Sequence, residues 1–161
     1  MERRNAWLSY EEADEKELEK LAKNYRTFLD AGKTERECVL ELTREAEAAG
    51  YVSLENKLAS GEQIKAGDKI YAVGMKKIMA MFHIGQGMNI PGAHIDSPRL
   101  DVKQNPLYED TDLVYLDTHY YGGVKKYQWV ALPLAIHGVI VKKDGTVVNV
   151  NVGEDEDDPV V

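Results

Sequence analysis

Apolar residues recur at helical spacing in two stretches within the first fifty residues. The apolar positions are Leu18, Leu21, Ala22, Tyr25, Phe28 and Leu29 in the first stretch and Val39, Leu42, Ala46 and Ala49 in the second. Each stretch begins with a candidate capping box and ends at a glycine suited to a helix C-terminus. These end residues are Ser9, Glu12 and Gly32 for the first stretch and Thr34, Glu37 and Gly50 for the second. The pattern predicts two consecutive helices.

Beyond Gly50 the pattern favours extended structure. Lys69–Val73 predicts a short strand, and Lys77–Ile84 is mostly apolar, which is typical of a strand buried on both faces. The pattern leaves a helix at Lys77–Ile84 as the alternative. Met88–Ala93 predicts another short strand that runs directly into His94. Helices followed by short apolar strands indicate an α/β fold.

The second half of the chain is rich in β-branched residues and shows no helical pattern. The predicted strands are Val114–Thr118, Trp129–Val141 and Val147–Val152, with a hairpin turn at residues 143–146 between the last two. Residues 104–112 contain a proline and several acids, a composition typical of a linker. We therefore predict a domain boundary here, with an α/β part at residues 1–103 and a β-rich part at residues 104–161.

Composition and charge narrow the function classes. The 161 residues include 20 Lys and Arg against 28 Asp and Glu, for a net charge of −8, which disfavours nucleic-acid binding through a basic face. No apolar run reaches the roughly 20 residues needed to span a bilayer, so we do not expect a membrane partner. The single Cys38 excludes an intramolecular disulfide and a cysteine-rich zinc site, and it fits the reducing cytoplasm.

One cluster supports a specific chemical hypothesis. The segment Gly92–Asp101 contains His94 and Asp96, two residues apart. At the end of a strand both side chains would project to the same side, with Ile95 turned towards the core. A neutral imidazole is a good zinc ligand, and a carboxylate that accepts its other N–H orients the ring. His94 is therefore a candidate metal ligand and Asp96 its orienting carboxylate, while spacing alone leaves a hydrogen-bonded structural histidine as the alternative.

The remaining candidates have weaker functional interpretations. His83 in an apolar strand and His137 in a predicted strand interior are typical of structural histidines. His119 lies in the segment Thr118–Gly123, which is either a ligand-facing loop or a tight turn with surface tyrosines. Ser97 is not part of a Gly-x-Ser-x-Gly motif, which disfavours a serine hydrolase.

Several longer motifs occur in a fixed order over nearly the whole chain. They are Lys33–Glu37, Gly67–Tyr71, Gly92–Lys103, Pro106–Asp110, Thr118–Trp129 and Gly153–Val160. In this order they resemble the N-terminal part of the bacterial M18 family of metalloaminopeptidases, the aminopeptidase I and aspartyl aminopeptidase group. Several ordered motifs are far more specific than a single His-x-Asp pair.

The resemblance implies a zinc-exopeptidase-type α/β catalytic domain that is interrupted by a β-rich insertion mediating dimerisation within a larger homo-oligomer. Residues 1–103 would be the N-terminal part of the catalytic domain and residues 104–161 the start of the insertion. The implied activity is release of N-terminal amino acids from peptides by a co-catalytic pair of zinc ions, although such ligands also accept cobalt or manganese. By this resemblance His94 binds one zinc ion, Asp96 orients His94, and residues 118–129 serve subunit contacts rather than the metal site.

The family pattern also requires further carboxylates and a final histidine, which the resemblance places beyond Val161. Because a catalytic zinc typically needs about three protein ligands, we expect these residues by themselves to be inactive as a peptidase. The alternative is a catalytically inactive fragment or an oligomerisation module in which His94 is a hydrogen-bonded structural residue.

Overall fold

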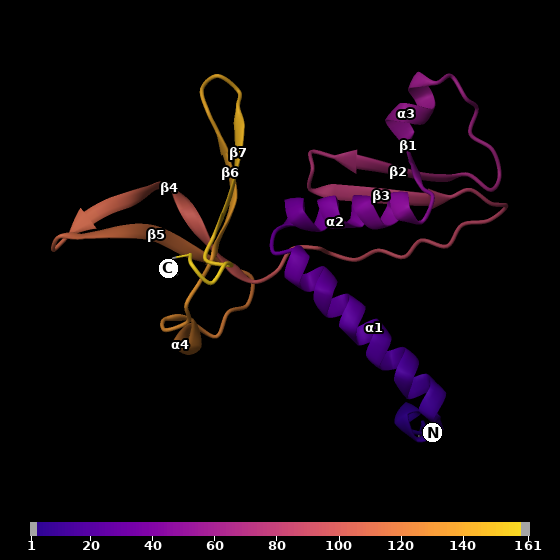
Figure 1. Cartoon of the computed structure of the whole chain (residues 1–161), viewed down its shortest axis with the longest axis horizontal. Helices are drawn as coiled ribbons and strands as arrows, with labels where there is room; N and C mark the ends of the chain where they lie inside the picture. Colours follow the sequence, from indigo (N-terminus) through magenta and orange to yellow (C-terminus); the bar gives the residue numbers. More distant parts are fainter. Residues whose placement is uncertain (1–2, 159–161) are drawn as a thin grey trace. The chain divides into compact units, whose positions relative to one another are not determined.

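The computed structural model describes residues 3–158 and divides the chain into two compact units, one up to Gly92 and one from Ala93 (Figure 1). The first unit contains η1 (Ala6–Ser9), α1 (Glu12–Ala31), α2 (Glu35–Ala48), β1 (Val52–Ser53), α3 (Leu54–Ala59), β2 (Lys69–Gly74) and β3 (Ile78–His83). The second unit contains β4 (Arg99–Asp110), β5 (Leu113–Tyr121), α4 (Lys126–Trp129), β6 (Ile136–Val141) and β7 (Val147–Val152). No helix of the described residues has the length and apolar character to cross a membrane.

The core of the first unit lies between α2 and a three-stranded sheet of order β1-β2-β3 (Figure 1). β1 pairs with β2 in parallel, and β2 pairs with β3 in antiparallel orientation. The buried apolar residues of the described chain are Cys38, Val39, Ala46, Ile70 and Tyr71. The Tyr71 hydroxyl donates a 2.7 Å hydrogen bond to Glu47 Oε1 on α2. This bond satisfies the polar end of an otherwise buried side chain and fixes α2 against β2.

Both ends of α2 agree with the sequence prediction. Thr34 Oγ1 accepts from the Glu37 amide at 3.3 Å, and Glu37 Oε2 accepts from the Thr34 amide at 2.8 Å, which completes a capping box. At the other end Gly50 has a φ of 84°, and the Tyr51 amide donates to the Ala46 carbonyl at 2.9 Å. This is a Schellman termination, in which a left-handed glycine lets the chain leave the helix.

The first predicted helix forms as α1 and ends at Gly32, but its predicted start is wrong. The capping box is made by Glu11 and Asp14, whose side chains and backbone amides bond reciprocally. The Ser9 hydroxyl instead donates within η1, at 2.6 Å. The predicted capping residue, Ser9, therefore belongs to a short 3-10 helix, and the carboxylate of Glu11 caps α1 instead.

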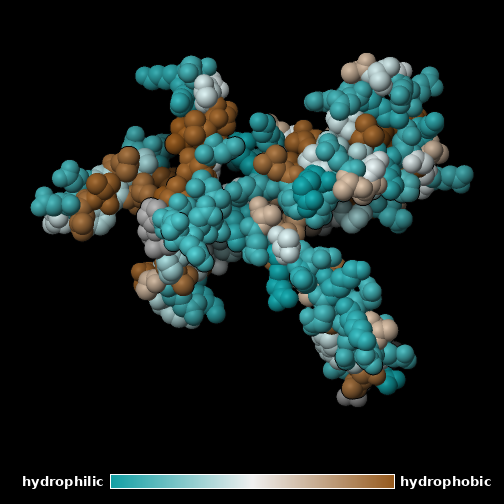
Figure 2. All heavy atoms as spheres, in the orientation of Figure 1, coloured by the Kyte–Doolittle hydropathy of each residue, from teal (hydrophilic) through white to brown (hydrophobic). Residues whose placement is uncertain are grey.

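The strand predicted at Lys77–Ile84 forms as β3, but the prediction that it is buried on both faces is wrong. In β3 the exposed fractions of Ile78, Met81 and Phe82 are 66%, 44% and 48%. Among the described residues β3 pairs only with β2 and lies at an edge of the sheet, so its other edge is uncovered. His83 at its end is exposed instead of structural in the core. No residue of α1 is buried either, and Figure 2 shows apolar side chains at the surface of both units.

The second unit consists of two antiparallel ribbons, β4–β5 and β6–β7. The linker predicted at residues 104–112 is wrong, because β4 continues through it to a tight turn. At this turn Thr111 and Asp112 have φ values of 52° and 61°, as a two-residue type I′ hairpin requires. Pro106 lies at a register shift between β4 and β5, where a strand tolerates a residue without an amide proton.

The observed division of the chain differs in position from the predicted boundary after residue 103. That position lies inside β4, which pairs with β5 on both sides of it, whereas the compact units divide between Gly92 and Ala93. The assignment of residues 1–103 to a catalytic domain and of residues 104–161 to an insertion stays a prediction.

Two other predicted strands are corrected. Met88–Ala93 does not form a strand, because residues 85–98 have no ladder partner in the described chain and form neither helix nor strand. Within Trp129–Val141 only β6 is extended, and α4 precedes it. The strands predicted at β2, β5 and β7 are confirmed, as is the turn before β7, where Gly145 has a φ of 85°.

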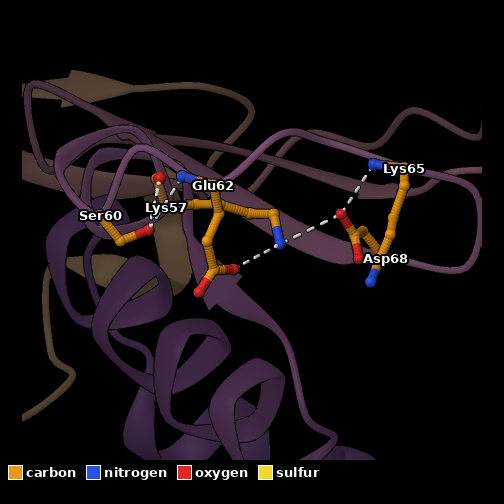
Figure 3. Close-up of polar contacts among 5 residues, drawn as sticks. All are labelled: Lys57, Ser60, Glu62, Lys65 and Asp68. Carbon is orange, nitrogen blue, oxygen red and sulfur yellow. Dashed lines mark hydrogen bonds and ion pairs between the residues drawn. The ribbon is translucent and has the colours of Figure 1, made fainter.

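A charged network closes the loop between α3 and β2 (Figure 3). Lys57 Nζ lies 3.1 Å from Asp68 Oδ2 and 3.3 Å from Glu62 Oε2. Asp68 Oδ2 also accepts from the Lys65 amide at 2.9 Å, and the Glu62 amide donates to Ser60 Oγ at 3.4 Å. The Lys65 amide, followed by the Lys57 ammonium, lowers the pKa of Asp68, whereas the bond to Asp68 raises the pKa of Lys57.

We predict that Gly32→Ala destabilises the first unit. A Cβ at this position would lie 2.7 Å from Cys38 Sγ, and Cys38 is only 4% exposed, so the thiol cannot move aside freely. Overpacking of this kind costs about 1–3 kcal/mol, which urea unfolding followed by circular dichroism would measure. Adding Cys38→Ala to Gly32→Ala should recover part of the loss, because the clashing sulfur is removed. If the stability losses of Gly32→Ala and Cys38→Ala simply add in the double variant, the steric explanation is wrong.

We predict that Asp68→Asn lowers the urea midpoint at pH 7 and that this difference disappears in acid. The folded state lowers the pKa of Asp68 from its usual 3.8, so its stabilisation is complete above that pH and is lost as the pH falls through the folded-state value. The measurement is urea unfolding of both proteins at pH 7 and at successively lower pH. Glu12→Gln, which removes an exposed helix ion pair, is the matched control and should change the midpoint little. A difference that persists below the pKa would contradict the charge-based explanation.

Candidate functional site

The structure brings His94 and Asp96 into contact, as the sequence predicts. His94 Nδ1 lies 3.1 Å from Asp96 Oδ1 and 3.0 Å from the Asp96 main-chain oxygen. An ionised carboxylate and a carbonyl only accept hydrogen bonds, so Nδ1 is the donor, and in the neutral ring Nε2 is the nitrogen that carries the lone pair. The His94 side chain is 83% exposed. The ring is therefore held by one nitrogen while the other is available to a metal ion.

The position of this pair in the fold differs from the prediction in one respect. His94 and Asp96 lie in the irregular segment that precedes β4, not at the end of a strand. The hydrogen bonds of the side chains, rather than the alternation of a strand, bring the two residues together.

The Asp96 carboxylate is itself held by a second residue, Tyr121, which is distant in sequence. The Tyr121 hydroxyl donates to Asp96 Oδ2 at 2.7 Å. This bond is the largest cause that lowers the pKa of Asp96, followed by its own backbone amide and by His94. Asp96 is therefore ionised at neutral pH, in the form that accepts from both neighbours.

Tyr121 is fixed in turn at the root of the β4–β5 ribbon. It is the last residue of β5 and pairs with Arg99, the first residue of β4, whose guanidinium lies 4.2 Å from the centre of the tyrosine ring. Arg99 Nε also donates to Asp101 Oδ1 at 2.7 Å. Gly122 follows with a φ of 72°, and a Cβ there would lie 3.3 Å from Pro98 Cα. The close approach at Gly122 brings the end of β5 against the residues that follow Asp96.

Sequence reasoning missed Tyr121. It assigned residues 118–129 to subunit contacts and not to the metal site, yet Tyr121 reaches the carboxylate that orients His94. The signal was the alternative reading of Thr118–Gly123 as a ligand-facing loop. To predict the contact between Tyr121 and Asp96, one must know which residues of β4 pair with which residues of β5. The sequence does not give this register, because the two strands differ in length and their pairing shifts between Val102 and Leu107.

The other candidate histidines of the second unit have partners of their own. His119 Nδ1 lies 3.3 Å from the Tyr120 carbonyl on the exposed part of β5. His137, with a side chain 11% exposed, lies in β6 as predicted, and its Nε2 is 3.0 Å from Glu154 Oε1. No hydrogen bond joins Ser97 to a histidine in residues 3–158, so the structure offers no activated serine there.

The available donor atoms fit one position of a zinc site. His94 offers an oriented imidazole nitrogen of the kind zinc prefers. Within residues 3–158, no group of three or more His, Cys, Asp or Glu side chains is arranged to hold a metal ion. Since a catalytic zinc takes about three protein ligands, His94 could serve as one ligand, but the described residues do not complete a site.

Comparisons with known proteins show the family of this chain. The model of the family described as aminopeptidase I zinc metalloprotease (M18) matches residues 28–161. A protein of Clostridium acetobutylicum called probable M18 family aminopeptidase 1 is 60% identical over 99% of this chain. The crystal structure of aminopeptidase I from that organism matches 99% of this chain and 36% of its own, with a TM-score of 0.82. Aminopeptidase I from Borrelia burgdorferi B31 matches with a TM-score of 0.89 and 37% identity, over 98% of this chain and 39% of its own.

These matches confirm the predicted fold class, because the solved neighbours are M18 aminopeptidases with the same mixed helices and strands. The chain spans 35% of the length of its curated relatives from Clostridium acetobutylicum and Thermotoga maritima. The family description names zinc as the metal. On the match of the family model and of these relatives, the chain belongs to the M18 family of zinc metalloproteases.

Proposed function

We propose that the protein containing this chain is a zinc aminopeptidase that releases N-terminal amino acids from peptides. The observation that carries the proposal is the orientation of His94, whose Nδ1 is committed to Asp96 while Nε2 stays exposed. Membership of a zinc peptidase family supports the metal and the peptide substrate.

The chain contributes His94 and Asp96 to a co-catalytic dizinc centre. His94 Nε2 would hold one zinc ion, and Asp96 would keep the ring in place and raise its basicity by accepting the Nδ1 proton. Bound zinc supplies Lewis-acid catalysis of peptide-bond hydrolysis. The remaining ligands would come from polypeptide outside these residues, so the 161 residues alone would be inactive. Cobalt or manganese would substitute for zinc at such ligands.

The distribution of exposed apolar residues supports a larger catalytic unit. In the first unit, Leu21 on α1 and Ile78 on β3 are each 66% exposed, and no residue of α1 is buried although its apolar residues recur at helical spacing, which is typical of a helix face that packs on a core. Further polypeptide packed on these faces would remove them from water. The single cysteine, Cys38, is buried and forms no disulfide among the described residues, which fits a cytoplasmic protein.

The β4–β5 ribbon supports assembly of the protein as a homo-oligomer. At its far end Tyr108 stacks on Tyr115 with ring centres 5.2 Å apart, and Leu107, Leu113 and Val114 beside them are 69%, 57% and 74% exposed. Figure 2 shows this apolar surface along the ribbon. The alternative function, a non-catalytic assembly module, would use the same ribbon and would need no metal at His94.

The proposal predicts that the protein from its natural source has a mass well above 18.1 kDa and binds about two zinc ions per chain. In this complete protein His94→Ala should lose zinc and reduce kcat/KM for an amino-acid anilide by about a hundredfold or more, because a ligand is removed. Mass spectrometry, metal analysis and light scattering on one sample give the mass, the zinc content and the subunit number.

The matched control is His83→Ala, because His83 is an exposed histidine at the end of β3 that the proposal does not assign to the metal site. This variant should keep both zinc and activity. Near-normal zinc content and turnover in folded His94→Ala would refute the assigned ligand. A natural protein of 18.1 kDa without zinc would favour the assembly module instead.

A further inference from the structure

We infer that Tyr121 is a positioning residue of the metal site: its hydroxyl holds the Asp96 carboxylate in the orientation that fixes the His94 ring. The inference rests on the proposed function, because it concerns how the proposed zinc ligand is held. It assigns a role in that site to a residue of the β4–β5 ribbon.

The first argument is geometric. The two oxygens of Asp96 have separate partners: Oδ1 lies 3.1 Å from His94 Nδ1, and Oδ2 accepts from the Tyr121 hydroxyl at 2.7 Å. A carboxylate that binds only through Oδ1 can rotate about its bond to Cβ and carry the imidazole with it. With Oδ2 held from the opposite side, that rotation would break a short hydrogen bond to a charged acceptor.

The second argument is the rigidity of the donor. Residues 85–98 belong to no strand ladder, so the segment carrying His94 and Asp96 has no strand partner to hold it. Tyr121, in contrast, is well anchored, because it pairs with Arg99 at the start of the ribbon and its ring lies under the Arg99 guanidinium. The hydrogen bond from the Tyr121 hydroxyl therefore ties the irregular segment that carries Asp96 to the ordered ribbon.

The neighbouring Tyr120 serves as a control, because it shows what the loss of a tyrosine hydroxyl does where that hydroxyl does not contact Asp96. Tyr120 precedes Tyr121 on β5, so its side chain points to the opposite face of the ribbon. Its ring lies under Lys126 Nζ at 4.2 Å, an interaction that phenylalanine would keep. Tyr120→Phe removes the same hydroxyl group without touching Asp96.

The test uses the complete zinc-loaded protein and measures the rate at which zinc passes to a coloured chelator. Tyr121→Phe keeps the ring beneath Arg99 and should release zinc roughly three- to tenfold faster, the effect of one lost hydrogen bond. Asp96→Asn should release it about 10- to 100-fold faster, as expected for the direct partner of a ligand. Tyr120→Phe should stay within about twofold of the parent, the scatter of a surface substitution.

A double variant distinguishes positioning from mere structural support. If Tyr121 acts through Asp96, adding Tyr121→Phe to Asp96→Asn should cause little further acceleration. An equal acceleration in both backgrounds would show that Tyr121 only stabilises the ribbon, and an unchanged rate in Tyr121→Phe would also overturn the inference. The urea midpoint of each variant checks that folding is retained.

Failure of the inference is distinguishable from failure of the proposed function. If His94→Ala binds zinc as the parent does, the ligand assignment is wrong and the proposed site falls with the inference. If His94→Ala loses zinc but Tyr121→Phe releases it at the parental rate, the site stands and the positioning role of Tyr121 is refuted.

Discussion

The pairing of Arg99 with Tyr121 is the constraint on which the geometry of the candidate site depends. It begins the β4–β5 ribbon and sets the tyrosine beside the segment that carries His94. The cation–π contact at 4.2 Å and the close approach of Gly122 to Pro98 reinforce this root. A shift of one residue in register would turn the Tyr121 side chain to the other face of the ribbon and break its bond to Asp96.

The structure separates two sources of order in the molecule. In the first unit, order comes from burial: α2 packs on β2 around Cys38 and Tyr71, and the Tyr71 hydroxyl finds its partner on α2. In the second unit, residues 93–158 contain no buried apolar residue, and order comes from the two hydrogen-bonded ribbons. A two-stranded ribbon is marginally stable by itself, so the side-chain contacts at its root have a large share in fixing its shape.

The sequence predicts the features that depend on near neighbours and fails where distant contacts decide. The capping box of Thr34 and Glu37 is predictable because both partners lie within one helical turn. The His94–Asp96 contact is predictable for the same reason, although its strand context is not. The exposure of Phe82 depends on which strands flank β3, and periodicity carries no information about that.

Tyr121 shows why this limit matters for function. It lies 25 residues from Asp96, and the intervening ribbon contains a register shift beside Pro106 and a two-residue turn at Thr111. Both irregularities must be known before the tyrosine can be placed opposite Arg99. An irregular segment pays the full entropy of ordering its backbone, and it has no ladder to offset that cost. The candidate ligand in this segment is therefore held by side-chain hydrogen bonds, and the order of the candidate site depends on the strand pairing of the ribbon beside it.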